Sequence, residues 1–376
     1  MRATWASERV ARPPGSPSRA PLLLHLLATL GAVKLRDLGE FALIERIERA
    51  ASRSRAAGRT RAVGRTRGLV VGIGDDGAVL RPPAGEDWVV TTDAFVEGVH
   101  FRWNTQSARC VGRRALVANL SDLAAMGARP LGFVFALAAP PSLEIRTFDG
   151  LLAGLLEEAE THGCPLIGGN LSRARQTSVT ITAQGSVARG RALLRGAARP
   201  GDRIFVTGTL GGAALEVARA AAGRGRVRGV PTPRLRAGRA LARMSGVGAC
   251  IDISDGLLAD LDHVLERSGC SAELDLASVP RPPRFEAACR RLGVDPLRLA
   301  TRGGEDYELL FTLRSRASGP RGSSEARGPS AARRASGAAG SGVVALSRRL
   351  GVAVTEIGKV VKRGARRSKT PGWRHF

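Results

Sequence analysis

Acidic residues beside glycine, serine and threonine recur in this sequence, several of them where predicted strands end. They fall in five segments: Gly72–Asp76 (GIGDD), Thr91–Asp93 (TTD), Asn119–Asp122 (NLSD), Ile251–Gly256 (IDISDG) and Gly303–Tyr307 (GGEDY). Carboxylates that converge at the rim of a sheet repel one another by several kcal/mol unless cations lie between them. Mg²⁺ prefers oxygen ligands and bridges carboxylates to phosphate oxygens. Together, the segments predict a magnesium site that handles phosphate groups.

Each segment alone has a simpler interpretation. Two aspartates after a strand most often form a turn or a helix cap, and Asp255 sits where the N-cap of the following helix is expected. Asp122 is harder to explain in this way, because an ionised aspartate on a packed helix face needs a partner. It is the combination of segments that favours a metal.

Several nucleotide and metal motifs are missing from the chain. It contains no G-x-x-x-x-G-K-[ST] phosphate loop, no kinase glycine-rich loop with H-R-D, and no H-E-x-x-H. P-loop NTPases, protein kinases and zincin-type proteases are therefore excluded. If the protein binds a nucleoside triphosphate, metal ions must neutralise most of the phosphate charge.

The composition bounds the remaining classes. The chain has 376 residues, 43% of them hydrophobic, and a formal net charge of +25. This length predicts two domains with a sizeable core. Residues 69–311 are nearly neutral, so the charge belongs to the ends, where the arginine-rich stretches lack the interleaved aromatic residues that stack on bases. Nucleic-acid binding is the weaker interpretation of this charge.

The cysteines and the apolar segments indicate the compartment. The five cysteines form no C-x-x-C pair, which argues against a disulfide framework or a zinc site. The apolar run Pro21–Val33 is too short to span a bilayer and lacks a convincing signal-peptidase site. We therefore expect a cytoplasmic protein that does not bind membranes.

Hydrophobic periodicity places elements along the chain. We expect a helix from Leu38 to Ile47 and a basic loop over residues 49–68. The expected strands are 69–73, 88–92, 131–138, 165–167, 177–187, 203–207, 249–253, 272–276, 307–313 and 352–357. The other expected helices are 113–126, 143–162, 213–222, 256–268, 285–292 and 343–350.

This alternation predicts an α/β or α+β fold made of two α/β units. We place the units at residues 38–187 and 188–376, with a cleft between them. Residues 1–37 are expected to be a disordered N-terminal extension. The Arg/Gly/Ser-rich stretch 314–342 is expected to be a disordered insertion.

From about Leu38 to the C-terminus the sequence resembles the thiamine-monophosphate kinase family. The resemblance rests on LGEFALIERI (38–47), VGIGDD (71–76), TTDAFVEGVHF (91–101), ALVANLSDLAAMGARP (115–130), IDISDGLLADLDHV (251–264) and GGEDYELLFT (303–312). That family belongs to the aminoimidazole ribonucleotide synthetase-like superfamily. The chain lacks the reactive cysteine of selenophosphate synthetase before the first acidic motif. It also lacks the terminal cysteine of the hydrogenase-maturation relative.

The resemblance implies roles for particular residues. The implied magnesium ligands are Asp76, Thr91, Thr92, Asp93, Asp122, Asn170, Asp252 and Asp255. The implied ATP-binding positions are Gly169, Asn170, Arg195 and Ser254, and those that meet thiamine monophosphate are His100, Glu305 and Trp373. The implied reaction is in-line transfer of the ATP γ-phosphoryl group to thiamine monophosphate, without a separate catalytic base. The resemblance also implies a homodimer.

One position departs from the family pattern. Asn170 stands where the family has a magnesium-binding aspartate after two glycines. An amide oxygen can coordinate Mg²⁺ but carries no charge, so we expect Asn170→Asp to lower the magnesium requirement. Two other interpretations stay open: another ATP-dependent synthetase of the same superfamily, and a basic binding protein that has lost its chemistry through Asn170.

Overall fold

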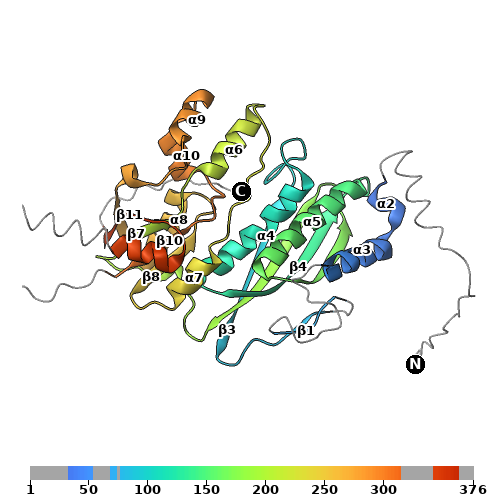
Figure 1. The fold of residues 1–376 in the computed structure, drawn as a ribbon, viewed down its shortest axis with the longest axis horizontal. Helices are drawn as coiled ribbons and strands as arrows, with labels where there is room; N and C mark the ends of the chain where they lie inside the picture. Colours follow the sequence, from blue (N-terminus) through green and yellow to red (C-terminus); the bar gives the residue numbers. More distant parts are fainter. Residues whose placement is uncertain (1–32, 54–67, 74–76, 315–341, 364–376) are drawn as a thin grey trace, which may run out of the picture.

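The computed structural model describes residues 33–53, 68–73, 77–314 and 342–363. Two mixed helix-and-sheet units lie side by side along the longest axis, each built on its own sheet (Figure 1). The expected fold class, two α/β units, is confirmed. Both sheets are nevertheless largely antiparallel: of the paired strands in the described part of the chain, only β4 and β5 run parallel.

The first unit is a four-stranded sheet with two long helices on one face. Its sheet has the order β3-β6-β4-β5, with β3 (Glu86–Val96), β6 (Ser178–Ala188), β4 (Arg129–Ala139) and β5 (Leu166–Arg173). Helices α4 (Ala108–Ala125) and α5 (Ile145–His162) pack together over this sheet (Figure 1). The long helix α4 stops at Met126 because Gly127, with φ 71°, follows it in the left-handed conformation.

Smaller elements surround this unit. Helices α2 (Leu35–Leu38) and α3 (Glu40–Arg53) lie beside α5, and the strands β1 (Leu69–Val71) and β2 (Val79–Leu80) form a separate pair. Two expectations are wrong here. Residues 34–37 belong to the fold, because Leu35 donates its amide proton to the Leu143 carbonyl. Helix α3 also runs to Arg53, into the segment expected to be a loop, and its Arg46 pairs with Asp149 of α5.

The second unit is a five-stranded antiparallel sheet with the order β8-β10-β7-β11-β9. Its strands are β7 (Arg203–Thr207), β8 (Val247–Asp252), β9 (Cys270–Leu274), β10 (Leu309–Leu313) and β11 (Val354–Lys362). Its helices are α6 (Gly212–Ala221), α7 (Leu235–Ala242), α8 (Leu257–Ser268), α9 (Phe285–Leu292), α10 (Pro296–Arg302) and residues 342–350. The sequence did not predict α7 and α10, which are only about two turns long.

The two units share a continuous core. Helix α4 of the first unit contacts α7 and β8 of the second. Phe205, Tyr307 and Phe311 of the second unit belong to the same buried apolar cluster as the α4 and β4 side chains.

At the end of β10, Arg314 donates to Asp202 at 2.6 Å, so the expected disordered insertion begins one residue too early. Among the described residues, no helix is long and apolar enough to cross a membrane.

Candidate magnesium and nucleotide site

Three aspartates from three different elements converge between the units. Asp93 lies in the middle of β3, Asp122 near the end of α4, and Asp252 at the end of β8. Thr91 donates its hydroxyl proton to Asp122, and Ser121 donates to Asp252 at 2.8 Å. Asp93 was expected at a strand end. The strand instead continues to Val96, and the alternation of side chains turns Thr91 and Asp93 toward α4.

Burial raises the pKa values of the carboxylates in this cluster, and at Asp93 and Asp252 neighbouring carboxylates add to it. Burial, followed by the charge of Asp122, raises the pKa of Asp252 to about 7. Asp93 is exposed as a residue, yet partial burial of its carboxylate and the charges of Asp122 and Asp255 also raise its pKa to about 7. Burial raises the pKa of Asp122 as well. The protein's own groups therefore leave negative charge in this cluster uncompensated.

Arg195 places a positive charge close enough to this cluster to act on its carboxylates. It begins the short 3-10 helix Arg195–Ala197 between the two units, and its side chain is exposed. Its positive charge lowers the pKa of Asp122 and of Asp252, although burial outweighs it at both. An exposed guanidinium beside buried carboxylates can pair with a phosphate chain that a cation links to those carboxylates.

The turn before α8 differs from the expectation. The N-cap residue is Gly256, with φ 115°, and not Asp255. The backbone N–H groups of Ser254, Asp255 and Gly256 all donate to one oxygen of Asp260, at 3.0 to 3.1 Å. A carboxylate from inside the helix thus satisfies the donors at its start. The carboxylate of Asp255 is left available to a ligand.

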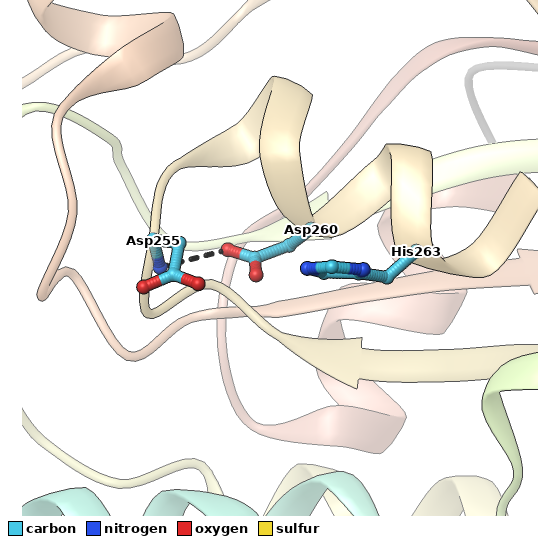
Figure 2. Close-up of side chains that lie close together, drawn as sticks. All are labelled: Asp255, Asp260 and His263. Carbon is cyan, nitrogen blue, oxygen red and sulfur yellow. Dashed lines mark hydrogen bonds between the residues drawn. The ribbon is translucent and has the colours of Figure 1, made fainter. Parts of the chain in front are cut away.

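Asp260 and His263 were missed by the sequence reasoning. Asp255, just before α8, and Asp260 and His263, in its first two turns, lie together with one possible ligand atom from each within 4.8 Å of the others (Figure 2). Asp260 and His263 share a helix face because they are three residues apart. The D-x-x-H spacing after Ser254-Asp255-Gly256 is the sequence signal that could have indicated them. The group could hold a divalent cation.

Thr92 and Asn170 do not reach this cluster within one chain. The Thr92 hydroxyl lies on the other face of β3 and bonds to Thr182 and to the Ile181 carbonyl, both at 3.0 Å. Asn170 lies on β5, where it pairs with Ala136 of β4. In the order of the sheet, β5 is three strands away from β3. At about 4.8 Å per strand, roughly 14 Å of sheet separates β5 from β3.

Gly169 is fixed by packing against the neighbouring strand. A Cβ atom there would lie 2.1 Å from the carbonyl oxygen of Phe135. Any larger residue would push β5 away from β4, so the glycine is needed whether or not a nucleotide binds there.

The two described residues expected to meet thiamine monophosphate lie on different units. His100 accepts a hydrogen bond at Nδ1 from the Val96 amide at 3.0 Å, and its ring stacks on Phe95. Glu305 donates its amide proton to the Ser254 carbonyl at 2.7 Å, which joins it to the turn before α8. Asp76 and Trp373 lie outside the described residues.

Comparisons with known proteins identify the family. Residues 74–187 match the AIR synthase related protein N-terminal domain, and residues 199–369 match its C-terminal domain. A thiamine-monophosphate kinase of Haemophilus influenzae is 39% identical over 253 residues, which cover 64% of this chain and 74% of that protein. The chain belongs to the thiamine-monophosphate kinase family.

Solved structures of this family agree with the fold. The thiamine-monophosphate kinase of Stenotrophomonas maltophilia is 36% identical, with a TM-score of 0.66 over 87% of this chain and 95% of that one. The complex of AaThiL with AMPPCP and TMP has a TM-score of 0.64 at 26% identity, over 92% of this chain and 99% of that one. The resemblance drawn from the sequence motifs is thereby confirmed.

Proposed function

We propose that this protein uses ATP to phosphorylate thiamine monophosphate, giving thiamine diphosphate and ADP. The observation that carries the proposal is the convergence of Asp93, Asp122 and Asp252 from three elements beside Arg195. The AaThiL relative, solved with AMPPCP and TMP, supports the same pair of substrates.

The carboxylates suit magnesium. Burial and the neighbouring carboxylates raise the pKa values of Asp93 and Asp252, which a bound cation would offset, and hard oxygen donors are the ligands that Mg²⁺ prefers. We propose that Asp93, Asp122, Asp252 and Asp255 hold the metal ions. When bound, Mg²⁺ neutralises the phosphate oxygens during phosphoryl transfer.

The protein's own residues position the two substrates. The acceptor is already an anionic phosphate, so no general base is needed. Arg195 pairs with the triphosphate as a bidentate cation, and Ser254, whose amide Asp260 holds, orients it. Glu305 and His100 orient the acceptor. Catalysis then depends on alignment and charge neutralisation.

We propose that the enzyme is a cytoplasmic homodimer. All five cysteines are free and buried, as a reducing compartment allows. Trp88 and Val90 on β3, turned away from α4, are 44% and 61% exposed. An apolar surface on an edge strand favours pairing with another copy.

The first test is an acceptor screen on the purified full chain. ATP, Mg²⁺ and candidate phosphate acceptors are supplied, and ADP is measured over time. The proposal predicts that ADP forms only when both thiamine monophosphate and Mg²⁺ are present. ADP formation that ignores thiamine monophosphate but follows another acceptor would instead support a different ATP-dependent synthetase.

A further inference from the structure

We propose that Arg114 is a positioning residue that holds Glu305 in place for the acceptor. The inference rests on the proposed function, because it concerns the half of the site assigned to thiamine monophosphate. Arg114 belongs to α4 of the first unit, whereas Glu305 belongs to a loop of the second.

Arg114 is buried and connects two segments of the second unit. Its side chain is 1% exposed. One terminal nitrogen donates to the Glu305 carboxylate at 2.7 Å, and the other donates to the Gly229 carbonyl at 2.8 Å. A planar guanidinium can make both contacts at once, whereas a lysine ammonium is a single point charge on a flexible stem.

Glu305 needs this support because its backbone is strained. Glu305 and Tyr307 have φ angles of 66° and 51°, which side-chain-bearing residues rarely adopt. Their amides donate to the carbonyls of Ser254 at 2.7 Å and Ile253 at 2.9 Å. Such conformations persist only where the surroundings hold them, and Arg114 supplies a charged contact to Glu305 itself, as Arg234 does to Glu308 further along the loop.

The Gly229 contact connects Arg114 to the region of His100, the other residue expected to meet thiamine monophosphate. The segment 226–229 also reaches the loop that follows His100. There the Val227 amide donates to the Thr105 carbonyl and Arg226 donates to the Trp103 carbonyl, both at 2.9 Å. Arg114 therefore contacts Glu305 directly and is connected through residues 226–229 to the loop that follows His100.

Helix α4 fixes the distance from this contact to the metal ligands. Arg114 and Asp122 are eight residues apart on the same helix, which separates them by about 12 Å along its axis. A rigid helix that holds Glu305 through Arg114 and carries Asp122 about two turns further on aligns the acceptor with the γ-phosphate. Replacement of Arg114 should therefore weaken acceptor use more than ATP use.

The first arm of the test measures position without any substrate. Arg114→Lys is compared with Arg113→Lys, its neighbour on α4, which pairs with the buried Glu158. Thermal melting first shows that both variants fold. Hydrogen exchange of the Glu305 and Tyr307 amides should become at least about fivefold faster in Arg114→Lys, and stay unchanged in Arg113→Lys. Unchanged exchange in Arg114→Lys would overturn the inference.

The second arm measures kinetics in a double-mutant cycle with Glu305→Gln. We expect Arg114→Lys to raise KM for thiamine monophosphate about tenfold, with KM for ATP and kcat within about twofold of the parent. In the Glu305→Gln background the same change should have little further effect, because the two residues act as one unit. Additive effects, or an equal rise in KM for ATP, would contradict the inference. If the parent protein ignores thiamine monophosphate, the proposed function fails while the exchange arm still decides the role of Arg114.

Discussion

Asp252 is a buried residue whose ionisation is opposed both by burial and by the negative charge of Asp122. Its pKa is about 7 in the folded protein, whereas its ordinary value is 3.8. Between these two pH values the folded protein therefore binds more protons than the unfolded chain. Its contribution to stability is therefore lost as the pH rises from about 4 to 7, and a bound cation restores it.

We predict that the melting temperature of the metal-free protein falls between pH 5 and pH 8, and that it falls less in Asp252→Asn. Mg²⁺ at pH 8 should raise the melting temperature of the parent more than that of this variant. Calorimetry across pH checks both expectations, with the exposed Asp275→Asn as the control. Equal pH slopes and equal magnesium shifts in parent and Asp252→Asn would contradict the account.

The residue types in the sequence predicted most members of the cluster, but not which neighbouring residues face away from it. Asp93, Asp122 and Asp252 were predicted from their neighbours in the sequence. The placement of Thr92 depends on which face of a strand each residue takes, and that of Asn170 on strand order. Both features arise from long-range pairing that a sequence pattern leaves open. The magnesium effect expected for Asn170→Asp therefore requires a second copy or a bridging ligand to bring Asn170 to the cluster.

At the scale of elements, the turn before α8 depends on one carboxylate. Asp260 alone accepts the amide protons of Ser254, Asp255 and Gly256. We predict that Asp260→Ala lowers the free energy of unfolding by roughly 2 kcal/mol, because three backbone donors, one buried and two partly buried, lose their acceptor.

Chemical denaturation measures this change. The control is Asp295→Ala, which removes an exposed cap that accepts one amide proton, from Leu297, and should cost about 1 kcal/mol. Asp260→Ala should also weaken ATP binding, since Ser254 and Asp255 move with the turn. A loss no greater than that of the control would show that other contacts hold the turn.

Helices and strands were predicted well where the apolar pattern extends over many residues, and poorly elsewhere. Helices α5, α8 and α9 follow clear helical spacing, whereas α4 is buried on nearly all sides. Strand β3 was expected to be too short because Thr91, Thr92 and Asp93 are polar, yet α4 covers one face of that polar stretch. Tertiary packing thus decides where a strand ends when its side chains also serve a site.

At the scale of the whole molecule, the exposed face of β3 predicts self-association. Sedimentation of the full chain should show a dimer, and Trp88→Glu should shift it toward the monomer, because a charge would then be buried in the interface. Val217→Glu, which changes an exposed apolar residue on α6, serves as the control. A parent protein that sediments as a monomer, or a dimer insensitive to Trp88→Glu, would contradict this proposal.

The destination of the γ-phosphoryl group is what makes this protein a kinase. ATP labelled in its γ-phosphate, supplied with Mg²⁺ and thiamine monophosphate, separates a kinase from a synthetase that releases phosphate. We predict that the label appears in thiamine diphosphate, one for each ADP formed, with almost none as free phosphate. Label released as inorganic phosphate while thiamine monophosphate stays unchanged would contradict it.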